Sequence, residues 1–279
     1  MEFRQLAPDT QRSRRRILES ILREPWSPDR IYADAPPSSV TRRAIEVLRD
    51  RKLDTPEAAR SRLKALGRVY DWAIGRDIVS RSLVREVRYP RKKPGGFHTW
   101  TPDEVAKFEA RHPIGSKARL ALALLLYTGQ RKSDVVCLGP QHVRDGWLHF
   151  TQQKNANTHP VVLELPVLPV LRTIIDETEK TGATTFLVTH HGKPFGRNGF
   201  GNKMREWCNQ AGLPKCTAHG LRKAGAVIAA ENGATASQLM AIFGWRTIKQ
   251  AELYTKRADQ RRLAGDAMRL LQRRPKVVG

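Results

Sequence analysis

Hydrophobic residues recur at helical spacing through the first 88 residues of the chain. In TQRSRRRILESILRE the apolar positions are Ile17, Leu18, Ile21 and Leu22, and Thr10 is a candidate N-cap. The same spacing continues in SSVTRRAIEVLRDR and in TPEAARSRLKALGRVYDWAIGRD, where Thr55 followed by Pro56 is typical of a helix start. The pattern predicts a helical domain over residues 1–88.

The pattern breaks at YPRKKPGGF, residues 89–97. Two prolines, two glycines and three basic residues in nine positions are typical of a linker between domains. We therefore predict a second domain over residues 98–279.

Helical and strand-like patterns alternate in the second domain. Thr101-Pro102 begins a helix, and an apolar helix follows over 116–128, ending near Gly129. Two β-rich runs, 147–152 and 158–165, flank a polar turn and predict a hairpin in which Pro160 lies at an edge or a strand start. Residues 167–275 are expected to be mainly helical. The predicted fold class is mainly α with a small β-sheet.

The last predicted helix, residues 260–272, is basic and amphipathic. Its apolar residues are Leu263, Met268, Leu270 and Leu271. Such a helix either packs on its own domain or docks on a neighbouring protomer, and the pattern leaves both open.

The net charge of the chain indicates which class of molecule it binds. The chain has 50 Lys and Arg against 27 Asp and Glu, a formal net charge of +23. Nucleic acid would neutralise this charge through phosphate contacts, whereas a membrane partner is disfavoured because no long basic amphipathic helix dominates. A basic but merely solvated surface is the alternative. The candidates for DNA contact are Arg14, Arg15, Arg16, Arg91, Lys92, Lys93 and Lys249.

Several classes of protein are disfavoured. Three irregularly spaced cysteines fit neither a disulfide framework nor a zinc site. The chain lacks an apolar run of about 18 residues and an N-terminal signal-peptide pattern, so we expect a cytoplasmic, nucleoid-associated protein.

Two pairs of closely spaced residues are candidates for chemistry on a phosphate. Arg131 lies three residues before Asp134, which could orient its guanidinium, although such pairs are common on surfaces. His219 and Arg222 would share one helix face behind a Thr217 cap, where two donors and the helix dipole suit a phosphate. A capping histidine beside a solvated arginine is the alternative.

Three more residues are candidates for the site because of the residues around them in the sequence. Lys154 lies at the predicted hairpin turn, where a lysine is usually only solvated. Trp245 follows Gly244, and Tyr254 comes nine residues later on a short helix. Both aromatic residues could be core residues, but Leu253 is the more natural core position, so we expect Tyr254 at a partly exposed cleft.

Taken together and in this order, these residues resemble the tyrosine recombinase (phage integrase) family. The matching text is TGQR at Arg131, Lys154 in a hairpin, HGLR at His219 and Arg222, and GW nine residues before Tyr254. The resemblance covers most of the chain, with residues 1–88 as a helical core-DNA-binding domain and 98–279 as an α+β catalytic domain. Asn155 departs from the threonine common in the family, and Trp245 stands where histidine is more frequent.

The resemblance implies that Tyr254 attacks a DNA phosphorus and forms a 3′-phosphotyrosine. Arg131, Arg222 and Trp245 would then bind the phosphate oxygens, His219 would be the base, Lys154 the acid, and Asp134 a support for Arg131 or its neighbours. The resemblance also implies double-stranded DNA as partner, a homotetramer on DNA, a monomer or weak oligomer when free, and no metal, cofactor or ATP. Many integrases carry a further N-terminal arm-site domain, and we expect this sequence to begin inside the core-binding domain.

Two other functions stay open at this stage. A type IB topoisomerase uses nearly the same residues, although the length and the helical first domain favour a recombinase. A DNA-binding regulator would use the helices only to dock.

Overall fold

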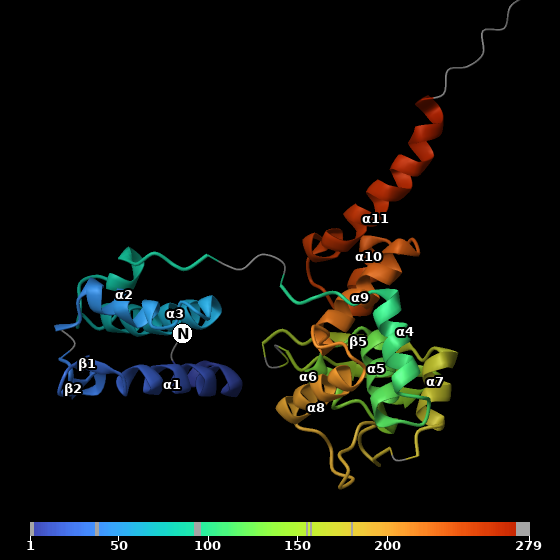
Figure 1. Cartoon of the computed structure of the whole chain (residues 1–279), viewed down its shortest axis with the longest axis horizontal. Coiled ribbons are helices and arrows are strands. Elements are labelled where there is room, and N and C mark those ends of the chain that lie inside the picture. The colour runs from blue at the N-terminus through green and yellow to red at the C-terminus, as the bar shows by residue number, and fades with distance from the viewer. Residues whose placement is uncertain are drawn as a thin grey trace, which may run out of the picture. The chain divides into compact units, whose positions relative to one another are not determined.

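The structure is a computed structural model that describes residues 3–36, 39–91, 96–154, 156, 158–179 and 181–271, without the side chains at 257 and 269. It divides into two compact units, Met1–Gly96 and Phe97–Gly279, called here the N-terminal and C-terminal units (Figure 1). Both are mainly helical. Among the described residues, none of the helices combines the length and apolarity that crossing a membrane requires.

The N-terminal unit packs three helices around two small apolar clusters. Its elements are α1 (Pro8–Leu22), β1 (Pro25–Ser27), β2 (Arg30–Ile31), α2 (Arg42–Asp50) and α3 (Pro56–Ile74). Ile45, Leu63 and Val84 belong to one cluster and Ile21 and Leu48 to the other. The helical prediction for this region is confirmed, while the short β1–β2 pair had no recognisable pattern in the sequence.

The first helix starts earlier than its predicted cap. Ala7 is the N-cap of α1 and Pro8 its first residue, so Thr10 lies inside the first turn. Proline is favoured at a first helical position because its missing N–H has no partner there anyway. Leu22, predicted to face the core, is 46% exposed at the end of the helix.

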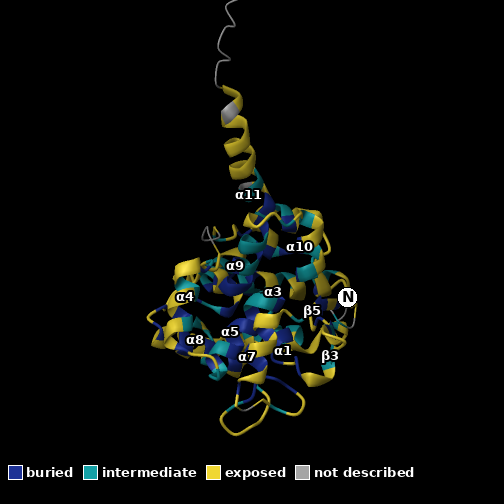
Figure 2. Cartoon of the chain, turned by 90° about the vertical axis from the view of Figure 1, so that its right-hand side faces the viewer, coloured by how far each residue is buried: buried dark blue, intermediate teal, exposed yellow. Residues whose placement is uncertain are grey.

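The C-terminal unit is built around α5 (Lys117–Thr128), most of whose residues are buried (Figure 2). Its other helices are α4 (Pro102–Arg111), α6 (Lys132–Val135), α7 (Pro169–Asp176), α8 (Arg197–Gln210), α9 (Ala218–Glu231), α10 (Ala236–Phe243) and α11 (Ile248–Met268). Thr101 caps α4 in a reciprocal box with Glu104, and Gly129 ends α5 with a φ of 63°. Both predicted boundaries are confirmed, because each depends on residues within one turn of the helix end.

A three-stranded antiparallel sheet in the order β3-β4-β5 completes this unit. The predicted hairpin is β4 (Trp147–Thr151) and β5 (Val162–Pro166), with Leu148 opposite Leu165. Pro160 precedes the edge strand β5, where its missing N–H costs no ladder bond. The third strand, β3 (Val143–Arg144), was not predicted, because two residues are too few for an alternating pattern.

The C-terminal helices differ from the prediction in one respect. A short helix carrying Tyr254 and a separate helix over 260–272 were expected, but α11 runs continuously from Ile248 to Met268. No glycine or proline separates Tyr254 from residue 260, so nothing in the sequence stops the helix. Its distal half is largely exposed in Figure 2, with Leu263 at 61% and Leu271, in the following turn, at 74%.

The packed face of α11 also corrects the choice between Leu253 and Tyr254. Leu253 is 75% exposed, whereas Ala251 and Thr255 are buried. Tyr254 packs against the cluster formed by α9, α10 and the start of α11. Positions 251, 254, 255 and 258 share one helix face, and that face turns Tyr254 inward.

Candidate active site

Arg131 and Asp134 lie on either side of a single helical turn. The Asp134 carboxylate accepts the Arg131 backbone N–H at 3.3 Å and the Gln153 backbone N–H at 2.7 Å. Asp134 therefore fixes the main chain of Arg131 and of the residue before Lys154. The Arg131 guanidinium itself donates from Nη1 to Gln152 Oε1 at 3.0 Å, so Asp134 orients it through the backbone and not by a direct side-chain bond.

Two buried glutamines link this turn to the neighbouring elements. Gln152 Nε2 donates to Gln130 Oε1 at 2.7 Å and to the Phe243 carbonyl at 3.1 Å. Gln130 Nε2 donates to the Ile242 carbonyl at 2.9 Å. The ends of α5, β4 and α10 are thus tied together by satisfied amides, which are costly to disrupt when buried. The sequence analysis did not identify these residues as parts of the site, although Gln130 precedes Arg131 and Gln152 lies two residues before Lys154.

Arg222 is buried, at 5% exposed. Its guanidinium donates to the Gly129 carbonyl and, at 2.7 Å, to the Phe243 carbonyl. Burial and then the charge of Arg131 lower the Arg222 pKa to about 10. The Arg222 guanidinium therefore stays charged at neutral pH, and its two hydrogen bonds to main-chain carbonyls hold it in place.

His219 lies in the first turn of α9, which begins after the predicted cap. The Thr217 hydroxyl accepts the Gly220 N–H at 3.1 Å. The His219 ring lies 4.8 Å from the Phe97 ring. Partial burial of the imidazole lowers the His219 pKa, and the charges of Arg222, Lys223 and Arg131 lower it further. The imidazole is thereby biased towards its neutral form, which can accept a proton.

Tyr254 and Trp245 stack beside Arg222. The two rings lie 5.2 Å apart and 10° from parallel, and Trp245 also stacks on Phe243 at 4.8 Å. The Arg222 guanidinium carbon is 5.9 Å from the centre of the Trp245 ring. Burial raises the Tyr254 pKa, while the charge of Arg222 opposes that rise. The phenol is therefore held near a cation but remains protonated at neutral pH.

The structure brings Arg131, His219, Arg222, Trp245 and Tyr254 into one neighbourhood, linked by shared contacts and electrostatic influence. Lys154 is exposed at the turn after β4, and no interaction described among the resolved residues joins its side chain to these five. Asn155 lies outside the described residues. Lys249 is exposed near the start of α11.

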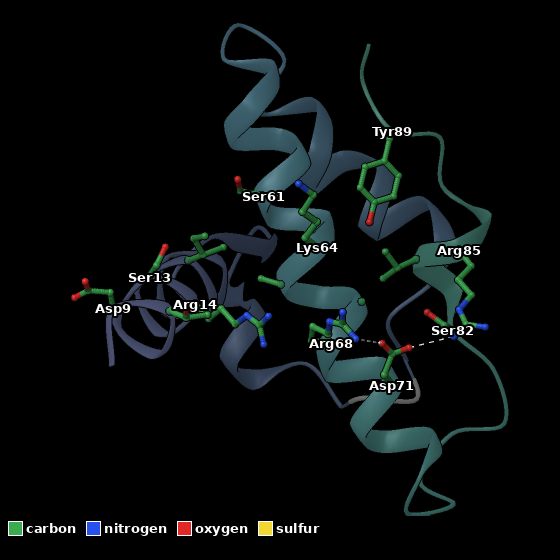
Figure 3. A pocket seen from close by; sticks show the side chains of 15 residues that line it. Asp9, Ser13, Arg14, Ser61, Lys64, Arg68, Asp71, Ser82, Arg85 and Tyr89 are labelled. Atoms are coloured by element: carbon green, nitrogen blue, oxygen red, sulfur yellow. Dashed lines mark hydrogen bonds and ion pairs between the residues drawn. The ribbon is translucent and has the colours of Figure 1, made fainter. Parts of the chain in front are cut away.

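Of the DNA contacts predicted in the first domain, Arg14 lines a pocket of 640 Å³ in the N-terminal unit (Figure 3). Its basic lining residues are Arg14, Lys64, Arg68 and Arg85. Asp71 pairs with Arg68 at 3.3 Å and with Arg85 at 3.2 Å. Arg15 lies over the Phe3 ring, Arg16 and Arg91 are exposed, and Lys92 and Lys93 lie outside the described residues.

One other cluster could in principle hold a metal. The ligand atoms of His98, Glu104 and Cys216 lie within 4.8 Å of one another. The Glu104 carboxylate already accepts from His98 Nε2 and from the Thr101 N–H, each at 2.8 Å. Burial raises the Cys216 pKa to about 12, which disfavours the thiolate. Hydrogen bonding thus accounts for the closeness of these side chains.

Comparison with known proteins gives a consistent picture. The model described as "Phage integrase family" matches residues 102–261, a span that contains all six candidate catalytic residues. A tyrosine recombinase XerC of Roseiflexus castenholzii is 26% identical over 75% of this chain and 70% of its own length.

Solved structures support the fold. A lambda integrase dimer bound to a core site has a TM-score of 0.76 at 20% identity, covering 90% of each chain. The Tn1549 transposon integrase in complex with transposon right end DNA has a TM-score of 0.70 at 15% identity, covering 93% of this chain and 95% of that one. The chain belongs to the phage integrase family of tyrosine recombinases.

Proposed function

We propose that this protein is a site-specific recombinase that cleaves and rejoins DNA through a covalent 3′-phosphotyrosine on Tyr254. The observation that carries the proposal is the convergence of Tyr254, His219 and two arginines from three separated segments on one site. The Phe243 carbonyl and the Gln152 amide hold these segments together. An arrangement of this kind suits one phosphodiester with an attacking oxygen beside it.

The two arginines stabilise the charge that develops on the phosphate. Attack on phosphorus gathers negative charge on the non-bridging oxygens, and a guanidinium offers those oxygens a fixed fork of charged donors. Arg222 is held by two main-chain carbonyls and Arg131 by Gln152. Neither guanidinium needs to reorganise as the reaction proceeds. The Trp245 indole N–H supplies a further neutral donor to the phosphate.

Proton transfer is assigned to His219 and Lys154. The raised Tyr254 pKa means that the phenol must lose its proton during attack, and the lowered His219 pKa leaves a neutral imidazole to receive it. The departing 5′-oxygen would be a costly alkoxide unless it is protonated, and Lys154 is the proposed acid. Asp134 accepts hydrogen bonds from the backbone N–H groups of Arg131 and Gln153, and thereby positions Arg131 and the segment that leads to Lys154.

The reaction needs no added energy source. The phosphotyrosine conserves the bond energy of the phosphodiester for rejoining, so ATP is not required. Arg131 and Arg222 supply the cationic charge that a metal ion would otherwise provide, so we propose a metal-independent reaction.

The proposed substrate is double-stranded DNA, bound by both units. The high net positive charge supports this, as do the structures of lambda integrase bound to a core site and, as a tetramer, to a Holliday junction. Contacts from Arg14, Arg15, Arg16, Arg91, Lys92, Lys93 and Lys249 would be to phosphates. We propose a tetramer on DNA, a monomer or weak oligomer when free, and action at the nucleoid.

The distal half of α11 is proposed to dock on a neighbouring protomer in that tetramer. Leu263, Met268, Leu270 and Leu271 are all more than 60% exposed, so they do not pack on the described part of their own unit. Exposed apolar side chains in a row are typical of a surface that a partner covers.

A nicked suicide substrate carrying the cognate site tests the chemistry. Wild-type protein should become covalently trapped on the DNA, while Tyr254→Phe should bind with similar affinity and give no adduct, because only the nucleophilic oxygen is lost. Denaturing electrophoresis of labelled DNA measures the adduct. Absence of an adduct from wild-type protein at saturating binding would contradict the proposal and favour a non-catalytic regulator. Relaxation of supercoiled plasmid without exchange between sites would favour the type IB topoisomerase.

A further inference from the structure

The residues that lead into α4 cross directly over the start of α9. We call residues 97–100 the strap. The Phe97 carbonyl accepts from Lys223 Nζ at 2.7 Å, and Trp100 Nε1 donates to the Thr217 carbonyl at 3.0 Å. Trp100 is 3% exposed and belongs to the main core of the unit. The strap is thus fastened at both ends to the helix that carries His219.

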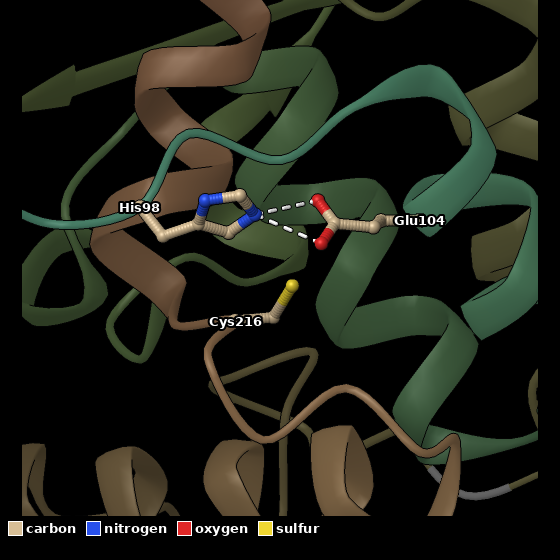
Figure 4. Close-up of side chains that lie close together, drawn as sticks. All are labelled: His98, Glu104 and Cys216. Atoms are coloured by element: carbon tan, nitrogen blue, oxygen red, sulfur yellow. Dashed lines mark hydrogen bonds and ion pairs between the residues drawn. The ribbon is translucent and has the colours of Figure 1, made fainter.

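The middle of the strap contacts the α9 backbone without an intervening side chain. A Cβ atom placed on Gly220 would lie only 2.0 Å from the His98 carbonyl oxygen, so only glycine fits there. Beside it, the His98 ring pairs with Glu104, which the capping box with Thr101 fixes in place, and Cys216 lies next to that pair (Figure 4). These contacts leave the strap little freedom to shift along α9.

Phe97 differs from its neighbours in the strap because its ring is 55% exposed. It lies outside the core cluster that contains Trp100. Its aromatic contact is with His219, at 4.8 Å between ring centres and 58° between ring planes. A tilted pair of this kind favours one orientation of each ring. A half-exposed phenyl contributes little to the core, so its contact with the imidazole is the more informative feature.

We propose that Phe97 is a positioning residue that holds the His219 imidazole in its reactive orientation and shields one of its faces from water. The inference rests on the proposed function, in which His219 is the base. It extends the site to the strap, whose first residue, Phe97, is also the last residue of the segment 89–97 predicted to link the two domains. Phe97 acts through His219 and does not itself touch the reacting atoms.

The electrostatic setting of His219 gives this proposal a pH signature. The charged groups that face the imidazole are Arg222 and Lys223 from α9 and Arg131 from the turn before α6, and all three lower its pKa after burial does. Removing the Phe97 ring leaves those charges in place and reduces only the burial. The His219 pKa should therefore rise towards its ordinary value in Phe97→Ala.

Two measurements on the whole chain test the role. The first is an NMR titration of labelled histidine in the free protein, with the His219 signal assigned from its absence in His219→Gln. The midpoint should move to higher pH in Phe97→Ala. The second is single-turnover cleavage of the suicide substrate at saturating DNA. Phe97→Ala should be slower by about tenfold at pH 8, as expected for a misplaced catalytic group, and slower still at pH 6, where more His219 is protonated.

Matched variants separate positioning from a general loss of structure. Phe97→Tyr keeps the ring and should retain the wild-type titration and rate. Trp147→Ala removes an aromatic residue that is 45% exposed elsewhere in the same unit and should change neither. An unchanged His219 titration in Phe97→Ala would overturn the proposal, as would an unchanged cleavage rate or a loss of DNA affinity equal to the loss of rate. If wild-type protein forms no adduct, the proposed function fails, while the NMR titration still decides whether Phe97 controls His219.

Discussion

Among the described residues, each unit buries one arginine, and the partners of the two arginines differ. Arg62 in the N-terminal unit is 4% exposed and forms an ion pair with Glu24, besides donating to the Leu48 carbonyl at 2.9 Å. Arg222 in the C-terminal unit is 5% exposed, but its described hydrogen bonds go to main-chain carbonyls. Among the described residues, no carboxylate lies within ion-pair distance of Arg222.

This difference separates a structural arginine from one suited to bind an anion. A buried charge is costly unless it is paired, and Glu24 provides that pairing for Arg62. Arg222 has no such ion pair within the described part of the chain: the charge of Asp134 offsets burial and the charge of Arg131 only in part, which favours an incoming phosphate. Strongly perturbed groups of this kind cluster at functional sites.

The largest effect expected from the comparison is that of Arg222→Ala on cleavage. Losing one fixed donor to the transition state should slow adduct formation by about 10³-fold, because donors of this kind contribute on that scale. DNA affinity should change much less, since many other phosphate contacts remain. Single-turnover cleavage and a binding titration on the same DNA measure the two. Equal losses of rate and affinity would contradict the assigned role.

Arg62→Ala should instead lower the stability of the protein and leave the cleavage rate nearly unchanged. It should lower the free energy of unfolding by about 3 kcal/mol, since it removes a buried guanidinium and leaves the partly buried Glu24 with Arg51 as its only described cation. Cleavage by the protein that remains folded should stay near the wild-type rate. Urea unfolding of the full chain measures the stability. Arg42→Ala is the matched control: its exposed pair with Glu46 should contribute about 0.5 kcal/mol or less. Equal losses of stability in Arg62→Ala and Arg42→Ala would contradict the structural role assigned to the buried Arg62.

A smaller loss of stability is expected when the pH is lowered through the range in which Glu24 becomes protonated. Burial alone would raise the Glu24 pKa, but hydrogen bonds and charges from Arg62 and Arg51 outweigh it, and the net shift is downward. A carboxylate with a lowered pKa in the folded state stabilises the fold above its unfolded pKa. That stability is lost as the pH falls from about 4.5 through the folded pKa. Unfolding in urea between pH 5 and 3 should show this loss, and Glu24→Gln should reduce it. An identical pH dependence in Glu24→Gln would argue against the pairing.

Local signals in the sequence predicted the helix boundaries well. Thr101-Pro102, Ser116 to Gly129, and Thr217 act within one turn of a helix end, so short segments contain the relevant information. The β4–β5 hairpin was predicted for the same reason. The continuity of α11 was missed because the basic amphipathic stretch at 260–272 suggested a separate helix, while packing against α9 and α10 decides the course of its first half.

The site was predicted only as a set of residue types in order. In the structure the charges of Arg131 and Arg222 act on His219, and that of Arg222 acts on Tyr254, while the catalytic roles of these four residues stay a prediction. The buried amides of Gln130 and Gln152 were not predictable, because a buried glutamine and an exposed one look alike in a sequence. The same holds for Phe97, which lies more than 120 residues from His219 along the chain.

The sequence by itself determined the mainly helical fold class and the positive charge, because composition and short-range periodicity encode these properties. The candidate residues for phosphoryl chemistry came from the resemblance to a family, carried by the order of residue types along the chain. Only the tertiary structure decided which arginine is neutralised, which face of α11 turns Tyr254 inward, and which aromatic ring meets His219. Those outcomes depend on contacts between distant segments, where burial sets the cost of every unpaired charge.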